Sequence, residues 1–214
     1  MKLNADFSKR VSMHAAQMDW VPSPSAGVER KMLDRIGDEV ARATSIVRYA
    51  PGSVFPAHVH GGGEEYFVLS GVFQDEEGDH PAGTYVRNPP SSRHTPASAP
   101  GCTIFVKLWQ FDPADRQNVR KDLLAAAEAG CAAAELFADT REIVRVRTML
   151  PGEEISLVPV GGFEVFVLSG GFREAGEDFG LWSWLRLPEG ARFEAVAGPE
   201  GCRFWTKEGH MRFA

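Results

Sequence analysis

The sequence predicts an all-β protein built from two copies of one β unit joined by a short helical linker. Its 22 glycines and 14 prolines separate short apolar runs, which is typical of short strands connected by turns. The two halves also repeat each other at an offset of 99 to 100 residues. EYFVLSG at 65–71 recurs as EVFVLSG at 164–170, and YVRNP at 85–89 recurs as WLRLP at 184–188. Such a repeat indicates two structural copies.

The first half is predicted to be an irregular arm followed by β-strands. Residues 1–27 are expected to form the arm, packed on the outside of the first unit or across a subunit boundary. Three later runs have the composition of strands: 43–49, 67–73 and 102–111. The acidic run at 74–79 is interpreted as a solvated turn. We expect His80 beside it to lie at the surface and not on a metal.

The composition changes between the two halves, and this change sets the predicted domain boundaries. Residues 123–137 are rich in alanine, which favours helix. Cys131 in this run is interpreted as a small buried apolar residue. The predicted domains are therefore 1–112 for the first unit, 113–140 for a partly helical linker and 141–214 for the second unit.

Charge and composition exclude several classes of partner. The net charge is -6, and no cluster of Lys and Arg offers the surface that nucleic-acid phosphates require. No run approaches the ~18 apolar residues of a membrane span, and no secretory signal begins the chain, so we expect a cytoplasmic protein. The three cysteines are widely spaced and form no disulfide framework. A homodimer is expected for an edge-rich β protein with an apolar arm.

A short stretch in the first half carries the predicted metal site. His58 and His60 are two residues apart, so in a strand their side chains share a face. Three glycines at 61–63 predict a tight hairpin that would place Glu64 opposite His60. Two imidazoles and a carboxylate on one point suit a divalent cation. A proline-stiffened loop ends in His94, which is the candidate fourth ligand.

These residues resemble the two motifs of the cupin superfamily. The first motif is met without a gap by Gly52, His58, His60, Glu64 and Gly71. The second motif is met loosely by Pro81, Gly83 and His94. The resemblance implies a double-stranded β-helix, or jelly roll, for each half. The chain would then be two tandem cupin barrels, a bicupin.

Two further runs resemble the ChrR-like cupins more narrowly. They are YVRNPP at 85–90 and HGGGEE at 60–65. This group includes the cupin half of an anti-sigma factor and relatives that resemble diketone and hydroxyacetophenone dioxygenases. The anti-sigma members carry a separate zinc domain with a cysteine pair, and residues 1–50 contain no cysteine. A sigma factor is therefore not the expected partner of this chain.

The second copy has lost the predicted ligands. At an offset of 99, the four positions are taken by Leu157, Pro159, Phe163 and Phe193. The offset shifts by one residue nearby, so Val158 or Val160 are alternative counterparts, and neither side chain binds metal. Apolar side chains cannot hold a divalent ion but can fill a barrel. We therefore expect one metal per chain, held by the first half, and a second barrel that is structural.

The residues beside the predicted ligands suggest a mostly apolar pocket. Val54 and Pro56 precede the histidines on their strand face, and Tyr66 follows Glu64 on its own face. A core aromatic is the preferred interpretation of Tyr66 over a catalytic acid. Arg87 and Asn88 are expected to order the loop that carries His94. Such a pocket suits a small organic ligand.

Three functions are consistent with these residues. The first is a non-haem dioxygenase acting on an enol, a diketone or a hydroxyaryl ketone. The second is a zinc-binding regulator that senses a small molecule without catalysis. The third is a purely structural metal protein, although structural zinc sites are usually closed and rich in cysteine. Zinc or iron is the expected metal, with nickel and manganese as alternatives.

Overall fold

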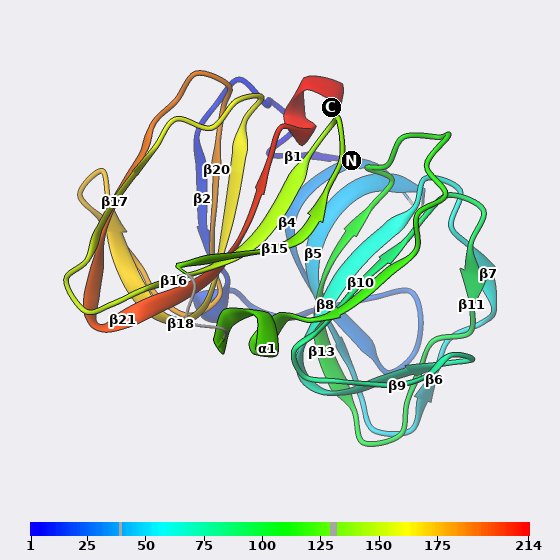
Figure 1. Cartoon of the computed structure of the whole chain (residues 1–214). Helices are drawn as coiled ribbons and strands as arrows, with labels where there is room; N and C mark the ends of the chain where they lie inside the picture. Colours follow the sequence, from blue (N-terminus) through cyan, green and yellow to red (C-terminus); the bar gives the residue numbers. More distant parts are fainter. Residues whose placement is uncertain (39, 129–131) are drawn as a thin grey trace. The chain divides into compact units, whose positions relative to one another are not determined.

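The computed structural model describes residues 1–38, 40–128 and 132–214 and is dominated by β-strands (Figure 1). The all-β prediction is therefore confirmed. The chain forms two compact units, one of residues 1–5 and 19–122 and the other of residues 6–18 and 123–214. None of the helices in the described residues has the length and apolar character needed to cross a membrane.

The first unit is a set of antiparallel strands around an apolar core. Its longest sheet runs in the order β1-β4-β5-β13-β8-β10-β14, while β7 and β11 pair with each other. The strands are β1 (Lys2–Leu3), β3 (Val21–Pro22), β4 (Val28–Gly37), β5 (Ala41–Tyr49), β6 (Ser53–Val54), β7 (His58–Val59), β8 (Glu64–Asp75), β9 (Gly78–Pro81), β10 (Thr84–Asn88), β11 (Arg93–His94), β12 (Ala97–Ser98), β13 (Cys102–Leu108) and β14 (Val119–Asp122).

The second unit is likewise antiparallel, with the strand order β15-β16-β21-β18-β20-β2. Its elements are β2 (Val11–His14), η1 (Ala15–Gln17), α1 (Leu123–Glu128), β15 (Ala133–Ala138), β16 (Ile143–Met149), β17 (Glu154–Leu157), β18 (Phe163–Glu174), β19 (Glu177–Phe179), β20 (Ser183–Leu187), β21 (Phe193–Glu208) and η2 (His210–Phe213). The paths β4-β5-β13-β8-β10 and β15-β16-β21-β18-β20 follow the same order, as the sequence repeat predicts.

Two equivalent glycines show why the repeated motif ends as it does. Gly71 and Gly170 both adopt positive φ, at 74° and 65°. A Cβ on Gly71 would collide with the carbonyl oxygen of Gly101, and a Cβ on Gly170 would collide with that of Gly201. Glycine is the residue that tolerates both the backbone conformation and the close approach. The Ser-Gly end of each repeat therefore lets a neighbouring strand pass at close range.

The core of the first unit explains the position of its central strands. β8 and β13 contain several aromatic and β-branched residues, which favour strands and pack well on a sheet surface. The buried cluster is Val28, Tyr49, Tyr66, Val68, Phe73, Val86, Cys102, Ile104 and Val106. The buried Cys102 thiol acts as a small apolar side chain, and burial raises its pKa.

The segments outside the repeat differ from their predicted structure. Residues 11–14, predicted to be part of an irregular arm, form β2, which pairs with β20 in the second unit. In the predicted linker, 119–122 is strand β14 of the first unit and 133–138 is strand β15 of the second. Among the linker residues that the structure describes, the helix is confined to 123–128. Edge pairing overrides local alanine propensity at β15. Cys131 lies outside the described residues.

Candidate metal centre

Two of the predicted ligands face each other on a two-stranded sheet. β7 and β11 are antiparallel, and His58 pairs directly with His94. Directly opposed residues in such a pair put their side chains on the same face. Residues 89–92 bring β11 back along β7. The backbone of His60 continues this pairing beyond the strand, because its N–H donates to the Ser92 carbonyl at 2.9 Å and its carbonyl accepts from the Ser91 N–H at 2.9 Å.

Glu64 also lies beside these histidines, but the strand pairing that places it there differs from the predicted hairpin. The tight hairpin at 61–63 is wrong, because β7 pairs with β11 while β8, which begins at Glu64, pairs with β10 and β13. The glycines serve close packing instead. A Cβ on Gly61 or Gly62 would collide with the ring of Trp109. The loop at 61–63 can therefore pack against the Trp109 ring, which places Glu64 beside the histidines.

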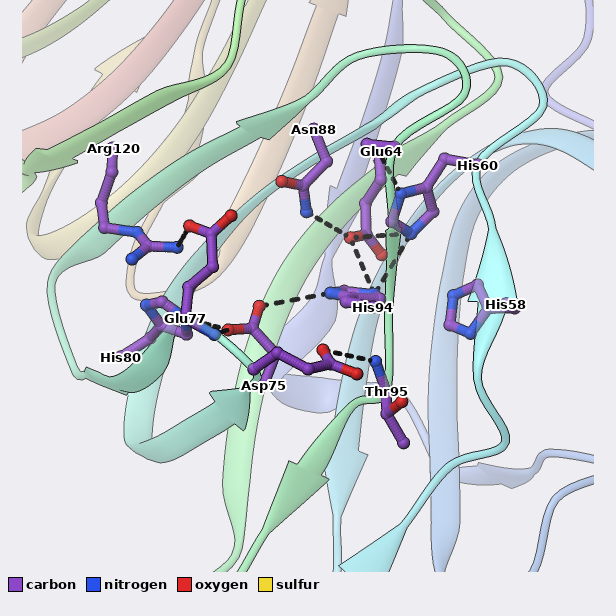
Figure 2. Close-up of polar contacts among 12 residues, drawn as sticks. His58, His60, Glu64, Asp75, Glu77, His80, Asn88, His94, Thr95 and Arg120 are labelled. Carbon is purple, nitrogen blue, oxygen red and sulfur yellow. Dashed lines mark hydrogen bonds and ion pairs between the residues drawn. The ribbon is translucent and has the colours of Figure 1, made fainter.

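The four predicted ligands converge (Figure 2). One ligand nitrogen from each of His58, His60 and His94 lies within 4.8 Å of the others. Nε2 of His60 is 3.1 Å from Nε2 of His94. The Glu64 Oε2 atom is 3.4 Å from the first of these nitrogens and 3.5 Å from the second. Apart from the half-buried His58, these side chains are buried.

The hydrogen-bond partners of His60 assign its tautomer. Its Nδ1 lies 2.9 Å from Oγ of Ser92, and that hydroxyl is 2.6 Å from the Pro89 carbonyl oxygen. A carbonyl can only accept, so the single Ser92 proton is donated to Pro89. The Ser92 oxygen must then accept from Nδ1–H of His60. Nε2 of His60 is left with a lone pair directed at the cluster.

The other two histidines are held in the same tautomer. Nδ1 of His58 lies 3.0 Å from the Pro56 carbonyl oxygen, and Nδ1 of His94 lies 3.3 Å from Oδ2 of Asp75. Both partners only accept, so each Nδ1 carries the proton. In the neutral form of each ring, Nε2 is therefore the unprotonated nitrogen. Metal-binding histidines are typically oriented in this way by an acceptor on the other ring nitrogen.

The donor set fits a divalent transition metal ion. Adjacent ligand atoms at ~2.1 Å from one ion lie about 3.0 to 3.4 Å apart. The three distances among Nε2 of His60, Nε2 of His94 and Oε2 of Glu64 are 3.1, 3.4 and 3.5 Å. Three lone-pair atoms gathered in a buried place repel each other, and a cation between them removes that repulsion. His58, His60 and His94 could therefore bind a metal with Glu64 completing the set.

The titration behaviour of the two buried histidines differs because their neighbours differ. Burial lowers the pKa of the His60 imidazole below its ordinary value, although the Glu64 carboxylate opposes this shift. Burial alone would also lower the pKa of His94, but its hydrogen bond to Asp75 and the charge of Glu64 raise it instead. The centre therefore contains one imidazole that resists protonation and one that is paired with a carboxylate.

Two residues that the sequence analysis missed support His94. Asp75 accepts from His94 with one carboxylate oxygen and from Nε2 of His80 with the other, at 2.9 Å (Figure 2). Burial alone would raise the pKa of Asp75, but these hydrogen bonds hold it well below its usual range. The predicted surface position of His80 is wrong, because its side chain is 1% exposed. The β8–β9 hairpin folds His80 under the acidic turn.

Asp75→Asn is expected to weaken metal binding by about 10- to 100-fold, because an amide has a single acceptor oxygen and no charge, so it cannot accept from both His80 and His94. The measurement is competition for zinc against a chelating dye. Glu76→Gln is the matched control, since Glu76 is on the same turn but its carboxylate accepts from the Thr95 backbone N–H at 2.9 Å. Unchanged affinity in Asp75→Asn would show that His94 needs no such support.

Asn88 has a direct role at the centre. Its Nδ2 donates to Oε2 of Glu64 at 3.1 Å. The side chain is buried, and its strand β10 pairs Asn88 with Glu64. Arg87, by contrast, lies 3.0 Å from Asp115 and stacks over the ring of Phe111. Asn88 thus orients the carboxylate, while Arg87 anchors the loop after β13.

Two cavities open onto the histidine cluster. The outer cavity, of about 640 Å³, is lined by polar groups that include His58, His94, Asn88, Arg93 and Asn118. The inner cavity, of about 170 Å³, is bounded by His58, Glu64 and a largely apolar wall from β4, β5 and β13. His58 lines both cavities.

The predicted pocket residues are placed elsewhere. Val54 and Pro56 are exposed, and neither lines the inner or the outer cavity. Tyr66 is 0% exposed in the core cluster and packs on Phe73 with a ring separation of 4.8 Å. This is the core position preferred for Tyr66 from the sequence. Burial raises its pKa far above the ordinary value.

The equivalent positions of the second unit form a packed core. Leu157 of β17 pairs with Phe193 of β21, just as His58 pairs with His94 in the first unit. Phe163 and Phe193 are 1% and 0% exposed, and their ring centroids are 5.3 Å apart. Pro159 is also buried. Apolar rings therefore occupy the space that the imidazoles and the carboxylate occupy in the first unit.

Comparisons with known proteins agree with this fold. The ChrR Cupin-like domain family matches residues 8–112. No curated protein matches the chain. The fold is similar to that of a candidate dioxygenase from Nostoc punctiforme, with a TM-score of 0.73 at 14% identity, over 93% of this chain and 82% of that chain.

Two further solved structures share the fold. The nickel(II) complex of the bacterial pirin YhhW from Escherichia coli has a TM-score of 0.69 at 10% identity, over 94% of this chain and 98% of that chain. A cupin 2 conserved barrel domain protein from Leptotrichia buccalis has a TM-score of 0.63 at 13% identity, over 97% and 99% of the two chains. Residues 8–112 therefore match the ChrR Cupin-like domain family, and the chain as a whole shares the fold of known cupin proteins.

Proposed function

We propose that the chain is a bicupin that binds one divalent transition metal in its first unit and uses it to bind and oxidise a small organic molecule. The ligands would be His58, His60, Glu64 and His94. The second unit would be a metal-free barrel that contributes structure. Iron would suit the oxidative function, and zinc, nickel and manganese accept the same ligands.

The acceptors at Nδ1 of the three histidines are the observation that carries this proposal. Each Nδ1 lies within hydrogen-bond distance of a fixed acceptor, so in each neutral ring Nε2 carries the lone pair. A purely structural cluster would more simply pair these nitrogens with donors. Four donors also leave positions of a five- or six-coordinate ion open, and the two cavities adjoin His58. An accessible centre of this kind suits a bound ligand better than a closed structural site.

The side chains around the centre support a dioxygenase by binding and orienting. Asn88 holds the Glu64 carboxylate, and Asp75 holds His94. The apolar wall of the inner cavity, including Ile104 and Val106, would favour the apolar part of a small ligand over water. A ferrous ion bound by this set would supply the redox chemistry with oxygen that no side chain provides. The solved structure described as a candidate dioxygenase has the same fold, which is consistent with this proposal.

Oxygen consumption tests the proposed function. The protein is purified without added metal, its metal content is measured, and Fe(II) is loaded anaerobically. Oxygen uptake with small 1,3-diketones and hydroxyaryl ketones is then followed for wild type and His58→Ala. Uptake by wild type that is lost in His58→Ala supports the dioxygenase. Uptake that persists in His58→Ala would place the reaction elsewhere.

A zinc-binding regulator is the second candidate. The match of residues 8–112 to the ChrR Cupin-like domain favours it, because that group includes the cupin half of an anti-sigma factor. Zinc at one ion per chain without turnover on any of the ketones would support the regulator over the enzyme. Cytoplasmic localisation and homodimer formation remain predictions of the sequence.

A further inference from the structure

The lining of the inner cavity includes two arginines that the sequence analysis did not identify. Arg30 lies on β4, two residues after Val28, so both side chains point to the same face of the strand. Val28 belongs to the buried core of the first unit. Arg30 and Arg35 both line the inner cavity, together with His58 and Glu64. A pocket with apolar walls thus has guanidinium groups and the metal-centre residues on its boundary.

The guanidinium group of Arg30 lacks a partner within the described part of the chain. Its side chain is only partly exposed, and Nε is buried without a hydrogen bond. The described residues place no carboxylate within ion-pair distance of it and no acceptor within hydrogen-bond distance. Arg35 differs, because it donates to the Asp38 carbonyl. Arg30 is therefore the cationic group that remains available in this cavity.

An unpaired guanidinium beside an apolar cavity is costly unless an anion pairs with it. Removing a charge from water is unfavourable, and buried charges are normally paired. Arginine presents a rigid planar fork that matches a carboxylate with two parallel hydrogen bonds. The unpaired Arg30 thus points to a ligand that brings its own negative charge.

We propose that the inner cavity binds a small organic carboxylate, with its acid group on Arg30 and its other end directed at the metal centre. This inference rests on the proposed function, because it names the substrate class of the same site. The cavity of about 170 Å³ is smaller than the ~300 Å³ of pockets for drug-sized ligands, so the molecule is small. A carbonyl or enol oxygen at the opposite end from the carboxylate would lie toward His58 and Glu64.

A matched pair of ligands tests this proposal. The probes are 2,4-dioxopentanoate, which is a 1,3-diketone with a free carboxylate, and its methyl ester, which lacks the charge. Binding is measured by calorimetry on the zinc-loaded protein, because zinc is redox-inert and prevents turnover. We expect wild type to bind the acid about 10- to 100-fold more tightly than the ester, as is typical of a charge-assisted hydrogen bond.

Four variants at three arginines assign the preference to a residue. Arg30→Gln should bind acid and ester equally, and Arg30→Lys should retain part of the preference because it keeps the charge. Arg48→Gln is the control, since Arg48 is exposed and pairs with Glu29 at the surface. Arg93→Gln removes the arginine of the outer cavity. A preference that Arg30→Gln retains and Arg93→Gln loses would overturn the proposal.

Metal content separates failure of this inference from failure of the proposed function. Wild type that binds no zinc would contradict the metal centre, whereas zinc-loaded wild type that binds acid and ester equally would contradict only the carboxylate site. Each variant is checked for one zinc per chain and for an unchanged melting temperature. If Arg30→Gln fails to fold, the comparison of wild type with Arg30→Lys still decides the outcome.

Discussion

His60→Ala is expected to abolish metal binding by the first unit and to remove the stability that the metal provides. His60 is buried, and its Nε2 lies 3.1 Å from that of His94 and 3.4 Å from Glu64, so its loss deletes a central donor. A ligand that binds only the native state stabilises it by about 4 kcal/mol at 1,000 times its Kd. Thermal unfolding with and without zinc should show a rise in Tm for wild type and none for the variant.

His14→Ala is the matched control for this experiment. His14 is also a histidine with a carboxylate partner, because its Nε2 lies 2.9 Å from Glu177. It belongs to the second unit, whereas the predicted ligands belong to the first. This variant should keep the zinc stoichiometry and the zinc-dependent rise in Tm. An equal rise in His60→Ala and wild type would show that the metal does not bind at the proposed centre.

Phe193→Ala is expected to destabilise the second unit by about 3 to 5 kcal/mol, as is typical when a buried aromatic ring is removed from a packed core. Phe193 is 0% exposed, and its ring centroid lies 5.3 Å from that of Phe163 and 5.4 Å from that of Phe172. It occupies the position that corresponds to His94. Urea unfolding of wild type and variant provides the measurement.

Phe213→Ala, which removes an exposed ring, is the control for this prediction. Phe213 in η2 is 50% exposed, so Phe213→Ala should cost less than about 1 kcal/mol. A near-zero cost for Phe193→Ala would mean that the ring fills no core. The second unit would then contain an open space that could serve a function, and its proposed structural role would fail.

Local sequence patterns predicted the ligand residues of the metal centre, but the strand pairing that brings them together differs from the predicted one. The spacing of His58 and His60 and the position of Glu64 suggested convergence through a hairpin. In the structure, the ligands converge because β11 pairs with β7 and so places His94 opposite His58. The glycines that suggested the hairpin instead make room for the ring of Trp109. Sequence spacing was sufficient to name these side chains but not to assign their strand pairing, because the pairing joins segments far apart in the chain.

The residues that the sequence analysis missed share one physical cause. His80 looked like a surface residue because it follows an acidic run, yet the β8–β9 hairpin buries it against Asp75. Arg30 looked like an ordinary charged residue of a strand, and only its place on the inner cavity distinguishes it. In both cases burial depends on which distant elements cover the side chain, and no local pattern encodes that.

The sequence by itself determined the all-β class, the internal repeat and the four candidate donors, because composition, periodicity and offset are local properties of the chain. Only the tertiary structure decided the hydrogen-bond partners of the three rings, the support of His94 by Asp75 and the unpaired state of Arg30. These features depend on hydrogen-bond partners and cavity walls from strands that are distant in sequence. They exist only when those strands are packed together.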